Sequence, residues 1–170
     1  MKSSSKLLVL SLTMAGFLLA GTAAKADPIS IVLDSPFQIG QPGTSVTFDA
    51  TLFNTDPTNT IYLNADSNNV DSPLTVDDSG FFNNAPFSLA PSSSSGDFEL
   101  FTVDIPNGTP VGLYTGSFEI LGGGPSDQNV VGTATFDVEI TPEPGTLLLL
   151  GTGLLALGFL AERKALGMRI

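Results

Sequence analysis

Two short patterns of paired carboxylates are the first candidates for chemistry in this sequence. One residue separates Asp97 from Glu99, and one residue separates Asp137 from Glu139. Because side chains on a strand alternate between its two faces, each pair would share a face with its carboxylates about 7 Å apart, a separation that glycoside hydrolases use. Both pairs also lie in alternating sequence, where a solvated polar face is the ordinary role. We therefore expect a solvated surface, with a carboxylate-based hydrolase as an alternative.

A polar stretch from Asn64 to Asp78 gathers oxygen donors of the kind that Ca²⁺ prefers. Its carboxylates are Asp66, Asp71, Asp77 and Asp78. Their spacing does not match an EF-hand loop, which needs a central Gly and a terminal bidentate Glu. We therefore expect a polar loop of turn-forming residues and no cofactor or metal. A Ca²⁺ site made by these four aspartates, which would stabilise the domain, is the alternative.

Histidine and cysteine are absent from the whole sequence. A Ser-His-Asp triad cannot be assembled without His, and zinc sites with His and Cys ligands are excluded as well. No disulfide can form, and no thiol is available as a nucleophile. The sequence therefore predicts that this protein is not an enzyme.

Charge is distributed in blocks along the chain. The 6 Lys and Arg residues all lie before Asp27 or after Ala161, whereas all but Glu162 of the 17 Asp and Glu residues lie between Asp27 and Glu143. A segment of this kind has no internal salt bridge and repels phosphate groups, so it does not bind nucleic acid. Its uniform charge favours solubility and makes its stability sensitive to ionic strength.

Residues 27–141 read as short strands separated by clusters of Pro, Gly, Asn and Asp. Alternation of apolar and polar residues predicts about seven strands. They fall near residues 29–33, 46–53, 61–63, 74–76, 98–105, 114–120 and 134–140. In the fifth, the apolar phase shifts between Leu100 and Phe101, which predicts a β-bulge. This pattern predicts an all-β domain, a two-sheet antiparallel sandwich.

The second half of this domain resembles bacterial immunoglobulin-like or fibronectin-like accessory domains. The resemblance runs from Leu89-Ala90-Pro91 to Gly112-Leu113-Tyr114-Thr115. It implies that Tyr114, at the start of a late strand, forms a tyrosine corner in which the hydroxyl bonds to the backbone. The alternative is an ordinary half-buried tyrosine.

Residues 1–26 have the pattern of a secretory signal peptide. Lys2 and Lys6 precede an apolar run over residues 7–20, and Ala24-Lys25-Ala26 forms a small-x-small cleavage site. We expect signal peptidase to cleave between Ala26 and Asp27, which would export the domain.

Residues 142–170 form a second targeting segment. Pro142-Glu143-Pro144 is followed by an uncharged stretch over residues 145–161 and then by Glu162, Arg163 and Lys164. We expect a transmembrane helix at 145–161, with the basic residues on the cytoplasmic side and the sandwich outside.

The order of tripeptide, apolar span and basic end resembles the PEP-CTERM sorting signal of exported bacterial proteins. This resemblance implies recognition by an exosortase, a membrane-embedded processing enzyme, near Pro142 to Pro144. It also implies a connection with exopolysaccharide and biofilm, because such proteins are typical of bacteria that make them. The alternative is a tail that is kept as a membrane anchor.

These observations favour an exported structural or interaction protein of the cell surface or extracellular matrix. A binding module for a glycan or a protein is the alternative, with extracellular polysaccharide as one partner. The chain has no Trp and only 2 Tyr residues, a composition that argues against an aromatic platform for sugars.

Overall fold

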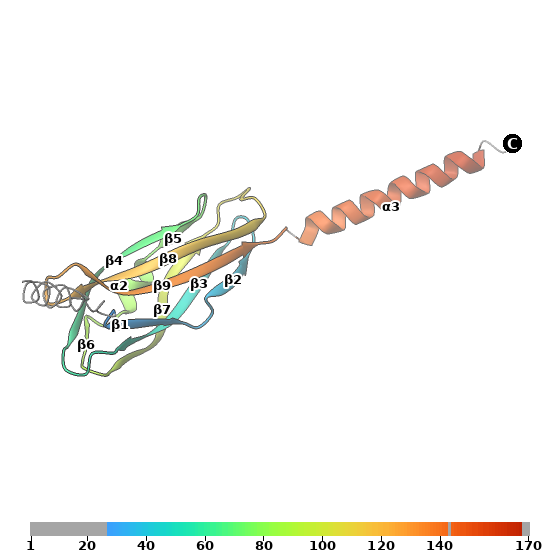
Figure 1. Cartoon of the computed structure of the whole chain (residues 1–170). Helices are drawn as coiled ribbons and strands as arrows, with labels where there is room; N and C mark the ends of the chain where they lie inside the picture. The colour runs from blue at the N-terminus through green and yellow to red at the C-terminus, as the bar shows by residue number, and fades with distance from the viewer. Residues whose placement is uncertain (1–26, 143, 168–170) are drawn as a thin grey trace, which may run out of the picture.

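Strands dominate the structure between residues 29 and 140 (Figure 1). The computed structural model describes residues 27–142 and 144–167, so the expected signal peptide, including Ala26, lies outside the described residues. The elements are β1 (Ile29–Leu33), β2 (Phe37–Gly40), β3 (Ser45–Asn54), β4 (Ile61–Val70), β5 (Thr75–Asp77), α2 (Ser79–Asn84), β6 (Ser88–Leu89), β7 (Ser94–Asp104), β8 (Gly112–Gly123), β9 (Asn129–Ile140) and α3 (Pro144–Gly167).

The strands form two sheets that face each other. The four-stranded sheet has the order β1-β3-β7-β5, and the five-stranded sheet has the order β2-β9-β8-β4-β6. The predicted all-β fold is therefore confirmed. The prediction of a wholly antiparallel sandwich needs one correction, because β2 pairs with β9 in parallel. Residues 34–36 carry the chain from β1, at the edge of one sheet, to β2, at the edge of the other. The partner of β1 is the antiparallel strand β3, whereas the partner of β2 is the parallel strand β9.

The strand order corresponds to that of an immunoglobulin-type sandwich, in which A, B, E and D make one sheet and C, F and G the other. In this correspondence β8 takes the place of strand F. Tyr114 lies near the start of β8, and its hydroxyl donates a hydrogen bond to the carbonyl oxygen of Pro110 at 2.9 Å. This is the tyrosine-corner arrangement that the resemblance to immunoglobulin-like domains implied.

Four phenylalanines hold the two sheets together in the absence of a disulfide. Phe48 and Phe101 come from the four-stranded sheet, and Phe118 and Phe136 from the five-stranded sheet. The Phe101 ring stacks on the Phe118 ring with 4.8 Å between centroids, and the Phe101 and Phe136 centroids are also 4.8 Å apart. Fully buried aromatic side chains contribute a large apolar area, so this cluster forms the centre of the core.

The predicted bulge is present in β7. Phe48 pairs with Phe101, but the next residue of β3, Asp49, pairs with Glu99, so Leu100 is the extra residue. Leu100 and Phe101 are both fully buried. The shift in apolar phase therefore has a simple cause, because the bulge turns two successive side chains toward the core.

Two stretches differ from the sequence-based expectation. Residues 64–70 continue β4 instead of forming a loop, because β8 pairs with β4 from Ala65 to Val70. The strand expected near residues 98–105 begins earlier, because β7 starts at Ser94. The short elements β2, α2 and β6 were not predicted, since each is too short for a periodic pattern.

The tail forms the helix α3, which Figure 1 shows projecting away from the sandwich. Among residues 27–142 and 144–167, no helix is both long and apolar enough to cross a membrane. The transmembrane helix expected at 145–161 is therefore not supported. At 1.5 Å per residue this uncharged stretch spans about 25 Å, which is at the short limit for a hydrocarbon core of roughly 30 Å.

Candidate functional site

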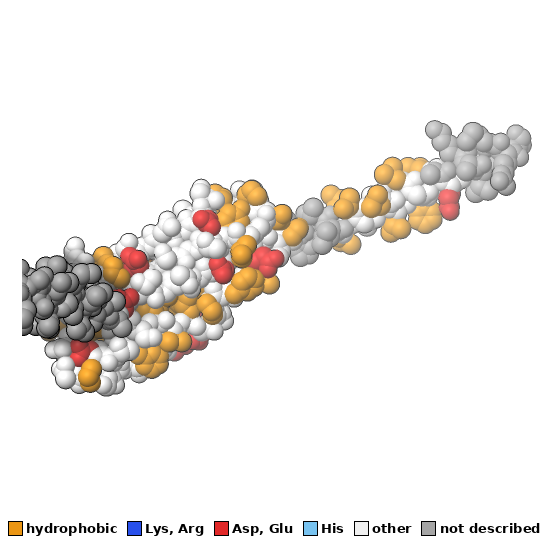
Figure 2. Space-filling model, in the orientation of Figure 1, with side chains coloured by type: hydrophobic (Ala, Val, Ile, Leu, Met, Phe, Trp, Pro, Cys, Tyr) orange, Lys and Arg blue, Asp and Glu red, His pale blue; other side chains and the backbone are white. Residues whose placement is uncertain are grey.

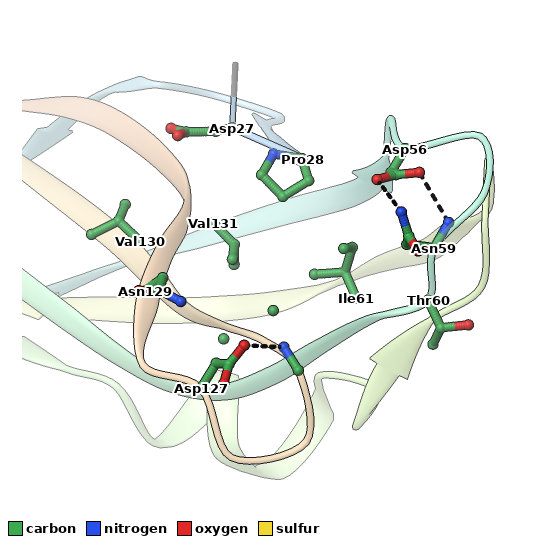
Figure 3. A pocket seen from close by; sticks show the side chains of 13 residues that line it. Asp27, Pro28, Asp56, Asn59, Thr60, Ile61, Asp127, Asn129, Val130 and Val131 are labelled. Carbon is green, nitrogen blue, oxygen red and sulfur yellow. Dashed lines mark hydrogen bonds between the residues drawn. The ribbon is translucent and has the colours of Figure 1, made fainter. Parts of the chain in front are cut away.

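A cavity opens at the end of the sandwich where β1 begins (Figure 3). Its volume is about 530 Å³. Three segments line it: the start of the described chain, the β3–β4 loop with the start of β4, and the β8–β9 turn. The lining residues are Asp27, Pro28, Asp56, Asn59, Thr60, Ile61, Gly122, Gly123, Gly124, Asp127, Asn129, Val130 and Val131.

Asp56 organises the β3–β4 loop on one side of this cavity. Its Oδ1 accepts hydrogen bonds from the backbone N–H groups of Thr58 at 2.8 Å and Asn59 at 2.9 Å, and its Oδ2 accepts one from the Asn59 side chain at 2.9 Å. The Asn59 side-chain amide and the Thr58 groups hold the pKa of the Asp56 carboxyl well below its usual range. Asp56 therefore stays ionised at neutral pH and cannot serve as a general acid.

Asp127 organises the β8–β9 turn on the other side. Its Oδ2 accepts a hydrogen bond from the backbone N–H of Gly124 at 2.9 Å. Asn64 of β4 reaches across and donates to the carbonyl oxygens of Gly124 at 2.9 Å and Asp127 at 2.8 Å. The carboxylates of Asp56 and Asp127 are thus committed to shaping the loops of the cavity.

The remaining lining groups limit the chemistry of the cavity. They are amides, a threonine hydroxyl, glycine backbone and aliphatic side chains. Asp27, Asp56 and Asp127 line this space from three different segments. The lining residues contain no cationic group and no His or Cys, so this set can accept hydrogen bonds but lacks a partner that would activate a nucleophile.

The fold gives the four calcium candidates different surroundings. Asp66 lies on β4 opposite Ile120 and therefore on the inner face, where desolvation by burial raises the pKa of its carboxyl and the nearby Asp78 raises it further. Asp77 Oδ1 accepts a hydrogen bond from the Ser79 N–H at 3.0 Å, which lowers the pKa of Asp77.

Asp71 has a separate structural role at the end of β4. Its Oδ2 accepts hydrogen bonds from the backbone N–H of Thr115 at 2.9 Å and from the Thr115 hydroxyl at 3.1 Å. Within the described ranges, no three His, Cys, Asp or Glu residues come together in a way that could hold a metal ion. The structure thus brings Asp66 near Asp78, whereas the Asp71 carboxylate bonds to Thr115 and the Asp77 carboxylate bonds to the backbone of Ser79.

The paired carboxylates lie on the outer faces of the sandwich. Asp97 and Glu99 are exposed on β7, and Asp137 and Glu139 lie on the solvent side of β9. None of these residues lines the end cavity. Each pair shares a face, as the two-residue period predicted.

Asn54 is an organising residue that was not predicted from the sequence. This side chain is buried at the end of β3 and donates to the carbonyl oxygens of Asn59, Leu89 and Ala90. The signal was available, because Phe48, Ala50, Leu52 and Asn54 form the inward phase of one strand. A polar residue in that phase indicates a buried hydrogen-bonding position.

The segment that follows β9 is held against the sandwich at its first residue. The backbone N–H of Thr141 donates to the carbonyl oxygen of Gly40 at 3.1 Å, which continues the β2–β9 pairing. Pro142 is exposed and Pro144 begins α3, whereas Glu143 lies outside the described residues. Pro at a first helical position suits a helix start, because its missing N–H has no partner to lose there.

Solved structures with a similar arrangement come from varied proteins. WR4, a C. elegans MSP family member, covers 69% of this chain and 100% of its own at 9% identity and a TM-score of 0.39. A complex of a CaDoc0917 variant with CaCohA2 matches over 66% of this chain and 99% of the chain in that structure, at 11% identity and a TM-score of 0.42. A non-cellulosomal cohesin from Archaeoglobus fulgidus matches over 69% of this chain and 94% of its own, at 16% identity and a TM-score of 0.35. Similarities this distant carry no information about function.

No curated protein matches the chain. A family model for the PEP-CTERM protein-sorting motif matches residues 141–164, which begin at the Thr141 that β2 holds and run through the basic residues after the apolar stretch. The motif indicates an exported protein that is membrane-anchored, or at the cell surface after exosortase processing. The C-terminal segment of this chain is therefore a PEP-CTERM protein-sorting motif, as in exported proteins sorted by an exosortase.

Proposed function

We propose that the sandwich of this exported protein acts outside the cell as a structural or interaction module and not as an enzyme. One observation carries the proposal: between Asp27 and Glu143 the chain contains no Lys, Arg, His or Cys. Acid–base and nucleophilic catalysis usually combine a carboxylate with one of these groups, and anionic substrates are usually held by cations. A surface of this composition is suited to contact and display.

The organisation of the chain supports this role. The sorting motif begins at Thr141, directly after β9 ends at Ile140, so the sandwich and the motif are adjacent in the chain. Figure 2 shows acidic side chains spread over the visible face of the sandwich. A uniformly anionic surface keeps displayed domains apart from one another and from anionic lipid surfaces. The resemblance of the tail supports the finer proposal that the module works in an exopolysaccharide matrix.

Cell fractionation with mass analysis of both termini tests the route. We expect a mature product that starts at Asp27 and ends near Pro142 to Pro144. The variant Pro142→Ala/Pro144→Ala should accumulate as the longer form, whereas the matched control Pro106→Ala/Pro110→Ala should be processed normally. Accumulation of the parent chain in the cytoplasm would contradict the proposal.

The non-enzymatic role has its own test. The purified chain is incubated with polysaccharide from the producing cells, and release of reducing ends is measured. We expect no release above buffer. Release that is lost in Asp97→Asn/Glu99→Gln or in Asp137→Asn/Glu139→Gln would instead establish a carboxylate-based hydrolase.

A further inference from the structure

The outer face of the five-stranded sheet carries exposed apolar side chains at the end next to the tail. Phe37 and Ile39 on β2 are 49% and 60% exposed. Val111, which directly precedes β8, and Leu113, in β8, are 60% and 58% exposed. Exposed apolar side chains gathered at one place on a soluble domain mark an interaction surface more often than isolated ones do.

The strand register places acidic residues among these apolar side chains. Ile39 pairs with Glu139, which pairs on its other side with Leu113, so a carboxylate lies between two aliphatic side chains. Phe37 pairs in the same way with Asp137. We call this set the tail-side patch, and its members are Phe37, Ile39, Val111, Leu113, Asp137 and Glu139.

The tail-side patch faces solvent and adjoins the sorting motif. Along β9, Phe136, Val138 and Ile140 are buried, so the alternating residues Asp137 and Glu139 point outward. Ile39 directly precedes Gly40, whose carbonyl oxygen accepts the hydrogen bond from Thr141. Figure 2 shows hydrophobic and acidic side chains adjoining at this end of the sandwich.

Charge decides what can cover this surface. The sandwich has no Lys or Arg to pair with Asp137 and Glu139, and the sandwich of a second copy would bring only further carboxylates. An anionic polymer would be repelled in the same way. A partner that contributes both cations and apolar groups would neutralise the two carboxylates and bury Ile39 and Leu113 together.

We propose that the tail-side patch binds a basic amphipathic segment of a partner protein. Lys or Arg side chains of the partner pair with Asp137 and Glu139, and apolar side chains between them cover Ile39 and Leu113. This inference rests on the proposed interaction role and names the class of partner for it. Two outward rows of the sheet, the Phe37–Asp137 row and the Ile39–Glu139–Leu113 row, set the alternation that a partner segment must match.

Fluorescence anisotropy with labelled peptides tests the proposal on the full chain. The probe is a peptide of alternating Lys and Val, and its matched control alternates Glu and Val. We expect binding of the Lys–Val peptide, weakening as salt shortens the Debye length from about 8 Å at 0.15 M to about 3 Å at 1 M. Binding of both peptides, or of neither, would overturn the proposal.

Matched variants locate the binding surface. Asp137→Asn/Glu139→Gln keeps the shape of the side chains and should weaken binding about tenfold. This is the loss of affinity expected when a residue at the centre of an interface is replaced. Asp97→Asn/Glu99→Gln removes the same charges in the same spacing from β7 and should leave the affinity within about twofold. Equal weakening by both variants would show general attraction to an acidic protein and would contradict a defined site.

A second pair of variants tests the apolar half of the surface. Ile39→Ser/Leu113→Ser should also weaken binding about tenfold, whereas Phe82→Ser/Phe87→Ser removes comparably exposed side chains elsewhere and should not. Dimerisation through the patch in sedimentation experiments would overturn the choice of partner. If the patch variants and the Asp97→Asn/Glu99→Gln control lose peptide binding equally while all of them are exported normally, only this inference is contradicted. A parent chain that is not exported contradicts the proposed function instead.

Discussion

Asn54 shows how one buried polar side chain can tie separate loops of the sandwich together. The residue is 2% exposed, and its Nδ2 donates to the carbonyl oxygens of Asn59 at 2.9 Å, Leu89 at 3.0 Å and Ala90 at 2.9 Å. Replacement by Ala removes this donor from the carbonyl oxygens of Asn59 and Leu89, whereas the carbonyl oxygen of Ala90 keeps its hydrogen bonds from the Ser93 N–H and hydroxyl. We expect Asn54→Ala to lower the free energy of unfolding by about 3 kcal/mol in chemical denaturation.

The matched control for this prediction is Asn83→Ala. Asn83 is exposed in α2, so its loss removes an amide without leaving a buried acceptor unpaired. Its free energy of unfolding should stay within about 0.5 kcal/mol of the parent. If the two variants were equally stable, the bonds of Asn54 would carry no net stabilisation.

Asp66 makes the opposite kind of contribution at neutral pH. Desolvation by burial, with added repulsion from Asp78, raises the pKa of its carboxyl. A carboxyl whose folded pKa is above its unfolded value stabilises the fold below the unfolded pKa of about 4, and this stabilisation is lost as pH rises through the folded pKa. The ionised Asp66 is therefore a cost at pH 7.

Replacing Asp66 removes this cost. We expect Asp66→Asn to raise the melting temperature at pH 7 by less than about 4 °C, because solvent screens a partly exposed carboxylate. The gain should shrink as the pH falls toward about 4. Asp97→Asn removes one charge at an exposed position and separates this effect from general relief of repulsion. A gain that did not depend on pH would contradict the assignment to the Asp66 carboxyl.

The sequence predicted single residues well where a period fixed their direction. The bulge at Leu100 followed from strand phase, and the tyrosine corner at Tyr114 followed from the resemblance to immunoglobulin-like domains. The inward phase that ends at Asn54 could have been extended in the same way as the phase at Leu100. The carboxylates between Asp66 and Asp78 could not be placed so. Their surroundings depend on which strand pairs with β4, and that information is not local in the sequence.

At the scale of elements, Gly122 permits the close pairing of β4 and β8. A Cβ at this position would overlap the carbonyl oxygen of Tyr62 and lie 2.9 Å from its carbonyl carbon. Both atoms are backbone and cannot rotate away. We expect Gly122→Ala to lower the free energy of unfolding by about 1–3 kcal/mol and to speed amide hydrogen exchange in β4.

Gly151 in α3 provides the comparison for Gly122. A Cβ there would meet nothing within 4 Å, so Gly151→Ala adds the same methyl group in open space. The unfolding midpoint of the sandwich should not change in this variant. A loss of stability in Gly151→Ala that equalled the loss in Gly122→Ala would remove the steric explanation.

Elements were predictable from the sequence when one face of a strand was apolar over its length. The strands β3 and β9 alternate over most of their length, and both were expected within their observed bounds. The second half of β4 is polar on both faces and was expected as a loop; it is a strand because β8 supplies its hydrogen bonds. The parallel β2 has four residues, too few for a period to show.

At the scale of the whole molecule, the sandwich must fold against its own charge. Apart from Glu162, the 17 acidic residues of the chain fall within 27–143, where no basic residue is present. Asp49 on β3 pairs directly with Glu99 on β7, and like charges opposite each other destabilise a sheet. The apolar core outweighs this repulsion, and most of the carboxylates avoid desolvation by pointing outward.

This balance predicts a strong response to ionic strength. Screening weakens repulsion between exposed carboxylates, so we expect the melting temperature of the purified chain to rise from low salt to 1 M NaCl, where the Debye length is about 3 Å. Asp49→Asn should reduce the size of the rise, because it removes the repulsion that Asp49 exerts on Glu99. CaCl₂ at matched ionic strength discriminates screening from binding. Equal midpoints in the two salts indicate screening alone, whereas a higher midpoint in CaCl₂ that is lost in Asp66→Asn would establish a Ca²⁺ site and contradict screening as the full explanation.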